Sequence, residues 1–213
     1  MPHQPASRSP RRAHVAEVLR EAILTGQLED GERLIEEKIA RELKTSRGPV
    51  REALRQLESE GFVRSFPYRG AAVLGVSDEE VQQVLVPVRL VLERYSFLKA
   101  AETMTDADFA ELAKQVWLLG EAARANDLAR SVDADMRFHE LVLEFADQPH
   151  TAQVWRSIAP RIRSYFFRYG RHRSLEGIAA EHHELLAAMQ TRDPDTIVNA
   201  LDEHIAVEAP PHA

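Results

Sequence analysis

The sequence contains no cysteine and only two tryptophans among its 213 residues. The absence of cysteine excludes disulfides, thiolate metal sites and a cysteine nucleophile. No apolar run approaches the roughly 18 residues that a membrane helix needs, and the longest run is Ala71 to Val76. The N-terminal stretch is charged and has no apolar centre, so it does not have the pattern of a secretory signal. We therefore expect a soluble cytoplasmic protein with no membrane partner.

The charge of the chain is unevenly distributed. Residues 1–76 carry 13 basic and 11 acidic side chains, whereas residues 77–213 carry 14 basic and 23 acidic ones. A mildly basic segment suits nucleic acid, and a strongly acidic one does not. Because hydrophobic residues make up 44% of the chain and are spread along it, we expect two folded parts with different partners.

Residues 12–76 have the pattern of three helices followed by a β-hairpin. Apolar residues recur at helical spacing, and Gly26 and Thr45-Ser46 separate the helices. Two short extended segments then flank a turn at Ser65 to Gly70. This order predicts a winged helix-turn-helix domain, preceded by a flexible arm at residues 1–11.

The third of these helices is the candidate DNA-reading element. Arg47, Arg51 and Arg55 recur every four residues and therefore lie on one face. Arginine suits both guanine edges and phosphate, and the helix N-terminus adds backbone N–H groups for a phosphate. The alternative is a solvated face on which these arginines pair with Glu52 and Glu58. Their position at the start of the helix, after a tight turn and before a wing, favours DNA.

Residues 77–208 are helical in character, and residues 209–213 form a tail. Ser77 followed by three acidic residues is a strong helix start. Six helices are expected, at about 78–103, 106–126, 128–146, 149–169, 174–191 and 194–207. Their short connections imply an antiparallel all-α bundle, so the fold class is mostly α.

Four polar residues interrupt the apolar stripes of three bundle helices. Asp135 and His139 are four residues apart on one stripe, and His182 and His204 lie on two others. A buried unpaired carboxylate is costly, so Asp135 needs a partner. One reading is a set of satisfied core histidines with one buried Asp–His pair. The other is a divalent metal site. Three imidazoles and one carboxylate are donors that suit zinc, and also nickel, manganese or iron.

The stretch from Ile23 to Gly70 resembles the DNA-binding domain of the GntR family of bacterial transcription regulators. The residues that carry the resemblance are Glu21–Gly26, Gly31–Leu34, Ile39-Ala40, Ser46–Glu58, Glu60–Val63 and Arg69-Gly70. The resemblance implies DNA contacts from Ser46, Arg47, Arg51 and the wing tip at Arg69-Gly70, with double-stranded operator DNA as the partner.

Two positions depart from the usual pattern of that family. Gly48 is grouped with the DNA-contacting residues, but it stands where a threonine is common and lacks that hydroxyl. Glu37 stands where an arginine is common. Because a carboxylate repels phosphate, we expect no DNA contact from Glu37.

The second part resembles the FCD effector-binding domain, in its six-helix form, of the FadR branch of the same family. The matching segments are Arg89–Glu93, Asp135–His139, Glu181-His182 and His204. The resemblance implies that Asp135, His139, His182 and His204 bind a divalent metal and that an effector binds beside it.

A metal with an open position is a natural anchor for a small organic acid. Arg89, with Arg161 or Arg163, could pair with its carboxylate in a bidentate manner. The alternative for Arg89 is an ion pair with Glu93.

Together these features predict a homodimeric, DNA-binding transcription regulator in which a small organic acid modulates, and we expect weakens, operator binding. One alternative is a metal-dependent enzyme that uses the histidine and aspartate cluster. No general base stands out beside that cluster, so we expect no enzyme. The other alternative is a DNA-binding protein without a small-molecule effector.

Overall fold

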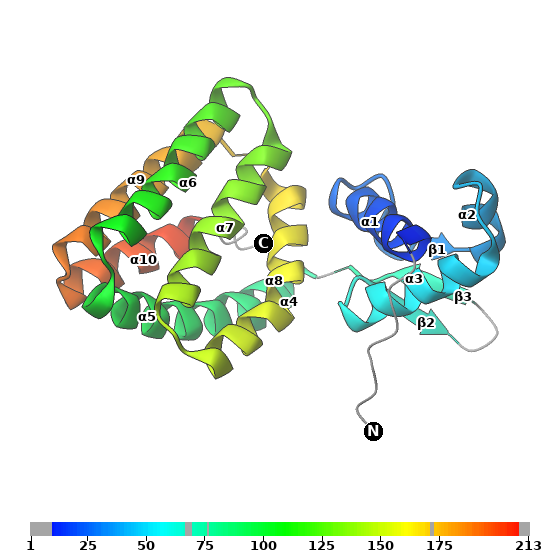
Figure 1. Ribbon diagram of the computed structural model, residues 1–213, viewed down its shortest axis with the longest axis horizontal. Coiled ribbons are helices and arrows are strands. Elements are labelled where there is room, and N and C mark those ends of the chain that lie inside the picture. Colours follow the sequence, from blue (N-terminus) through cyan, green and yellow to red (C-terminus); the bar gives the residue numbers. More distant parts are fainter. Residues whose placement is uncertain (1–9, 67–69, 76, 171–172, 209–213) are drawn as a thin grey trace. The chain divides into compact units, whose positions relative to one another are not determined.

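The chain divides into two units, residues 1–75 and residues 76–213. The computed structural model describes residues 10–66, 70–75, 77–170 and 173–208 (Figure 1). Three predicted features therefore lie outside the described residues. They are most of the N-terminal arm, Arg69 at the wing tip, and the tail at residues 209–213.

The first unit has the predicted winged helix-turn-helix order. Its elements are α1 (Pro10–Leu24), β1 (Arg33–Leu34), α2 (Glu36–Glu42), α3 (Arg47–Ser59), β2 (Val63–Phe66) and β3 (Gly70–Val73). Strands β2 and β3 form the expected antiparallel hairpin, in which Val63 pairs with Val73 and Phe66 with Gly70. The short strand β1 was not predicted; it pairs with the other edge of β3 and gives the sheet order β1-β3-β2.

Helix α1 starts earlier than the sequence suggested. It begins at Pro10, so residues 10 and 11 belong to a helix and not to the predicted arm. Proline suits the first turn of a helix, because its missing N–H has no intrahelical partner there and its fixed φ is helical. Further along, Val15 and Leu19 of α1 are buried, as are Val50 and Leu54 of α3. The core of this unit therefore includes the apolar faces of α1 and α3, which pack together.

The second unit is the predicted helical bundle. Its elements are α4 (Asp78–Glu80), the π-helical turn η1 (Val81–Leu85), α5 (Val86–Thr103), α6 (Asp106–Arg124), α7 (Leu128–Phe145), α8 (Pro149–Tyr169), α9 (Leu175–Thr191) and α10 (Pro194–Glu208). Helix α7 packs against α5, α6 and α8, and α9 packs against α6 and α10 (Figure 1). None of the helices in the described ranges is long and apolar enough to cross a membrane.

The first bundle helix was expected to be continuous over residues 78–103, but it contains a wide turn. Val81–Leu85 form a π-helical turn, and the N–H of Val86 bonds to the carbonyl of Val81. Pro87 follows directly, early in α5. Proline has no N–H and its ring crowds the carbonyl four residues earlier, so a wider turn before it relieves the clash.

Asparagine and aspartate close two of the connections between bundle helices. Asn126 and Asp147 follow α6 and α7 with positive φ, a conformation that their short polar side chains tolerate. Asp127 then caps α7 by accepting from the N–H of Arg130. The apolar stripes of α5, α7, α9 and α10 meet in one core around Phe97, Phe138 and Met189.

Candidate functional site

The predicted DNA-reading face of α3 is exposed. Val50 and Leu54 turn inward and are buried, whereas the side chains of Arg47, Arg51 and Arg55 are 62%, 52% and 68% exposed. The period of the helix separates the two faces, as expected. The arginines are thus displayed together, at and after the helix N-terminus.

Each of these arginines also meets an acidic side chain, but only Arg55 meets one of the two partners that the solvated-face alternative named. Arg51 donates to Glu36 of α2 through Nε at 3.0 Å and Nη2 at 2.9 Å. Arg47 Nε lies 3.7 Å from the same carboxylate. Arg55 pairs with Glu52 at 2.9 Å. The hydrogen bond from Arg51 lowers the pKa of Glu36 despite its partial burial.

The other predicted DNA contacts surround this face. Ser46 occupies the N-cap position of α3, although its hydroxyl makes no capping hydrogen bond among the described residues. Gly48 lies in the first turn of α3, where a Cβ atom would meet no described atom within 4 Å. Gly70 opens β3 with a φ of 78°, a backbone conformation that glycine adopts without strain.

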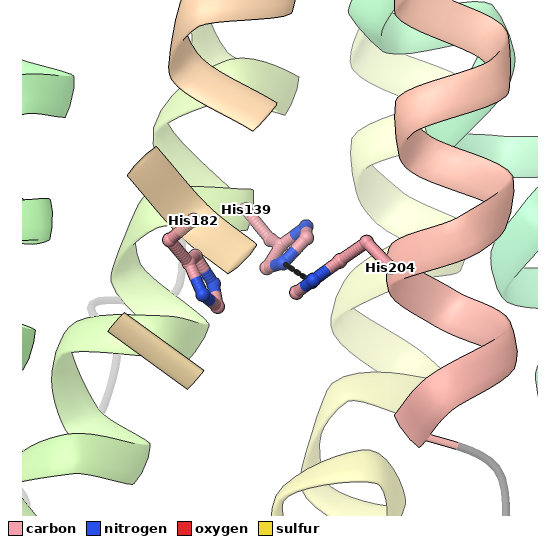
Figure 2. Close-up of side chains that lie close together, drawn as sticks. All are labelled: His139, His182 and His204. Carbon is pink, nitrogen blue, oxygen red and sulfur yellow. Dashed lines mark hydrogen bonds between the residues drawn. The ribbon is translucent and has the colours of Figure 1, made fainter. Parts of the chain in front are cut away.

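Three histidines from three helices converge in the second unit. His139 comes from α7, His182 from α9 and His204 from α10 (Figure 2). His139 and His182 are fully buried and His204 is 3% exposed. One ring nitrogen from each lies within 4.8 Å of the others, and the Nε2 atoms of His139 and His204 are 3.2 Å apart.

Asp135 completes the predicted set. It lies one turn before His139 on α7 and is 4% exposed. Its Oδ2 atom is 3.5 Å from Nε2 of His182. Two ligands of one zinc ion, each at about 2.0–2.1 Å, are at most about 4.2 Å apart. The His139–His204 and Asp135–His182 separations, 3.2 and 3.5 Å, are therefore compatible with a shared divalent metal, and the donors, three imidazoles and one carboxylate, suit it chemically.

The opposite side of each imidazole faces an oxygen. His139 Nδ1 lies 2.7 Å from Oε2 of Glu93, and His182 Nδ1 lies 2.8 Å from the carbonyl oxygen of Ile178. His204 Nδ1 lies 3.6 Å from Oε2 of Glu181. In all three residues Nδ1 is the nitrogen that faces an acceptor, so Nε2 is the nitrogen suited to bind a metal.

Glu93 and Glu181 differ in environment. Glu93 of α5 is fully buried, and this burial raises its pKa, an effect that the adjacent Arg89 guanidinium opposes. Burial also disfavours the charged form of Glu181, but contacts with His204 and Arg173 outweigh it and lower the pKa of Glu181. Each glutamate therefore has one histidine and one arginine as neighbours.

Arg89 is buried beside the cluster. Its Nε donates to Oε1 of Glu93 at 2.6 Å, its Nη2 lies 3.0 Å from Nε2 of His139, and its guanidinium stacks over the ring of Phe166. The ion pair with Glu93, which was the alternative for Arg89, is present, and the contact of Arg89 with an effector carboxylate stays a prediction.

Two small pockets adjoin the cluster and share Tyr165 and Phe166 of α8. The first is lined by Leu128, Ser131, Val132, Asp135, Tyr165, Phe166, Tyr169, Gly170, Arg173 and Ile178. The second is lined by Val81, Leu85, Val86, Arg89, Ile162, Tyr165, Phe166 and Ile205. In the first pocket, Ser131 is 1% exposed and its Oγ has no hydrogen-bond partner among the described residues.

The structure gives no support to the prediction that Arg161 or Arg163 faces the effector. Arg161 donates to the carbonyl of Ser157, and Arg163 pairs with Asp133. Within the part of the chain that the structure describes, neither residue lines the two pockets beside the cluster. The inward face of α8 is formed by other positions, Ile162, Tyr165 and Phe166.

Sequence reasoning missed Arg173 and Ser131, and it gave no role to Glu181. Arg173 pairs with Glu181 at 2.7 Å and lines the first pocket. Ser131 lies one turn before Asp135 on α7 and therefore continues the polar line within the apolar stripe. That spacing was a usable signal for Ser131. Arg173 lies in the connection between two helices, where the sequence has no helical periodicity from which its direction could be predicted.

Comparison with known proteins gives two family matches. Residues 11–73 match the bacterial regulatory proteins of the gntR family, and residues 84–207 match the FCD domain.

Two relatives cover most of the chain. One is a gluconate operon transcriptional repressor from Bacillus licheniformis, 28% identical over 95% of this chain and 85% of the relative. The other is a probable D-xylose utilization operon transcriptional repressor from Paenarthrobacter nicotinovorans, 26% identical over 88% of this chain and 82% of the relative. Among solved structures, Escherichia coli McbR/YncC has the same fold, with a TM-score of 0.77, 23% identity, and coverage of 94% of this chain and 95% of that one.

Proposed function

The chain belongs to the gntR family of bacterial regulatory proteins and carries an FCD domain, and we propose that this domain is a metal-dependent sensor of a small organic acid. The chain is a DNA-binding transcription regulator, as its relatives are. The observation that carries the proposal is the convergence of three buried histidines whose Nε2 sides face one another and Asp135. The relatives are regulators, which argues against the alternative of an enzyme built on this cluster.

Operator contacts are assigned to the exposed face at the start of α3 and to the wing. Arg47, Arg51 and Arg55 offer guanidinium groups to bases and phosphates. Ser46 and the backbone N–H groups of the first turn, including that of Gly48, suit a phosphate. Gly70 lets the wing backbone approach the minor groove, next to Arg69 at the wing tip. The protein is proposed to act as a homodimer, because one winged helix reads only half of a palindromic operator.

The metal is assigned to His139, His182, His204 and Asp135. Zinc suits this set best, and nickel, manganese and iron are the other candidates. When bound, the metal supplies positive charge and an open coordination position to an anionic ligand. The residues of the chain hold the donors in place, because all four are buried on packed helices.

The ligand is assigned to the first pocket, between Asp135 and Arg173. Arg173 offers a guanidinium to a second anionic or hydroxyl group, and the buried Ser131 hydroxyl offers one further hydrogen bond. Arg89 lines the neighbouring pocket, on the other side of Tyr165 and Phe166. The relatives are named for gluconate and D-xylose operons, which supports a hydroxylated organic acid, and we expect it to weaken operator binding.

A thermal-shift screen tests this proposal. Full-length protein is treated with chelator, reloaded with Zn²⁺ or Ni²⁺, and mixed with D-gluconate and a panel of other hydroxy acids, sugar acids and dicarboxylic acids. An acid at about 100 times its Kd stabilises the protein by about 2.7 kcal/mol. The proposal predicts that this shift appears only with metal. An acid that gives the same shift with and without metal contradicts it.

The matched variants for this screen are adjacent on α9. His182→Ala removes a buried member of the cluster, whereas His183→Ala removes an exposed neighbour. The metal-dependent shift is expected to disappear in the first variant and to persist in the second. Equal shifts in the two variants place the ligand or the metal elsewhere.

A further inference from the structure

A buried glutamate stands behind one of the proposed metal ligands. Glu93 lies on α5, in the interior of the bundle, and its side chain is 0% exposed. One of its oxygens contacts Arg89 and the other lies 2.7 Å from Nδ1 of His139, a residue of α7. A carboxylate in such a place is costly unless its neighbours compensate for lost hydration.

We propose that Glu93 is a positioning residue that fixes the ring of His139 with Nδ1 protonated and Nε2 directed at the metal. This inference rests on the proposed metal site and adds to it a residue that does not touch the metal. A neutral imidazole carries one N–H, and the group that accepts from it decides which nitrogen is left with a lone pair. The two atoms are 2.7 Å apart, but the angle at Nδ1 is not that of a hydrogen bond. The inference therefore rests on their proximity, and a small rotation of the ring would align the N–H with the carboxylate oxygen.

Packing limits the other orientations of the His139 ring. The ring lies 5.8 Å from that of Phe97 and meets Phe138 edge-on at 5.6 Å. Ring rotation that exchanged Nδ1 and Nε2 would remove the Nδ1–Glu93 contact and turn the protonated nitrogen toward the cluster. The aromatic rings therefore limit the rotation of the His139 ring sterically, and the oxygen of Glu93 favours the orientation in which Nδ1 faces it.

Arg89 holds Glu93 in turn. The Arg89 Nε–Glu93 Oε1 contact of 2.6 Å spans one turn of α5 and is buried on both sides. Arg89, Glu93 and His139 therefore form a chain of contacts that runs from the second pocket to the cluster. A change at Arg89 reaches His139 through Glu93 as well as directly.

Glu181 repeats this arrangement in a weaker form. It lies 3.6 Å from Nδ1 of His204 and pairs with Arg173, but its side chain is 25% exposed. A longer and more hydrated contact constrains its histidine less. Glu181 is therefore the internal comparison for Glu93, and its removal is expected to have a smaller effect.

The test combines a tautomer measurement with a metal titration on full-length protein. The variants are Glu93→Gln, which keeps an acceptor oxygen, and Glu93→Met, which removes it. Glu102→Gln and Glu102→Met on the same helix are the controls, because the Glu102 side chain is 59% exposed and pairs only with Lys99 among the ion pairs of α5 that the structure describes. Glu93→Met alone leaves the buried Arg89 unpaired, which could disturb folding. The double variant Arg89→Met/Glu93→Met removes both buried charges and therefore avoids this effect.

The tautomer is read from the ¹⁵N shifts of the His139 ring in chelator-treated protein, which does not depend on the metal. Nδ1–H is expected in wild type and in Glu93→Gln, and a mixture of tautomers in Glu93→Met. Affinity for Zn²⁺ is expected to fall 10–100-fold in Glu93→Met, as is common for such outer partners, with a smaller loss in Glu93→Gln and in Glu181→Gln. If Glu93→Gln keeps the wild-type tautomer of His139 and most of the wild-type affinity for Zn²⁺, the acceptor oxygen at position 93, and not a general change in the fold, is what positions the ring.

An unchanged His139 tautomer in Glu93→Met and in the double variant, with Zn²⁺ affinity equal to that of Glu102→Met, overturns the inference. Failure of the metal site itself has another signature. Wild-type protein that binds no Zn²⁺ contradicts the proposed function, while the tautomer measurement still decides whether Glu93 positions His139.

Discussion

Arg51 of α3 donates two hydrogen bonds to the carboxylate of Glu36, at 3.0 and 2.9 Å. The pair connects α3 to α2 and holds the guanidinium plane in one orientation on the exposed face. A guanidinium that is held in this way loses less rotamer freedom when it binds the edge of a guanine.

Replacement of Arg51 is therefore expected to reduce sequence discrimination. Arg51→Ala should cost about 1–3 kcal/mol on a selected operator and much less on random duplex DNA, because a bidentate contact to guanine is lost. The measurement is binding affinity for both duplexes at one fixed salt concentration. Arg55→Ala, two turns from the helix start, is the comparison. An equal loss on both duplexes would identify Arg51 as a phosphate contact.

The wing is tied to the reading helix by Glu58, and this link predicts a pH dependence. Glu58 accepts from the backbone N–H and the hydroxyl of Ser65, each at 2.7 Å, and these bonds lower the pKa of Glu58 from 4.5. A lowered folded-state pKa stabilises the fold above about pH 4.5, the ordinary value for glutamate. That contribution is lost as the pH falls through the folded-state value.

Glu58→Ala should therefore lower the free energy of unfolding by about 0.5–1 kcal/mol at pH 7, an amount kept small by solvent. Urea unfolding at several pH values measures the difference from wild type, which should shrink toward pH 3. Glu52→Ala is the control, because Glu52 is also exposed on α3 but pairs with Arg55 and not with the wing. A loss in Glu58→Ala that stays constant down to low pH would exclude the ionised Glu58 as its source.

The first pocket predicts which side chains recognise the ligand. Arg173→Met should weaken binding of the acid found in the screen by about 1.5–3 kcal/mol, the usual value of a hydrogen bond to a charged group. Ser131→Ala should cost about 0.5–1.5 kcal/mol if the ligand carries a hydroxyl at that point. Calorimetric titration of metal-loaded variants measures both, and Arg161→Met is the control on α8. Equal losses in Arg161→Met and Arg173→Met would place the ligand outside this pocket.

Most of the fold follows from local signals in the sequence. Ser77, Asp127 and Ser174 cap the helices that begin after them, and each lies within or beside a predicted boundary. Strand β1 was missed because two residues are too few to show the alternation of apolar and polar side chains that predicts a strand. The wide turn before α5 was missed because the apolar pattern continues through it, and Pro87 was its one local sign.

The inward direction of the polar site residues was predictable because each interrupts an apolar stripe. His182, which lies on the predicted apolar stripe of α9, is buried, whereas its neighbour His183 is exposed. Arg161 and Arg163 carried no such signal, since residues two apart on a helix face different ways. The contact of Glu93 with His139 joins helices far apart in the sequence, so the period of one helix cannot predict it.

The metal content of the chain tests the central claim most directly. Wild-type protein is loaded with Zn²⁺, passed over a desalting column and analysed for metal and protein, beside His182→Ala and His183→Ala. The account predicts about one ion per chain in wild type and in His183→Ala, and a loss of most of it in His182→Ala, because that variant lacks one of the four protein donors. Wild-type protein that retains no metal, or a His182→Ala variant that retains as much as wild type, would contradict the account.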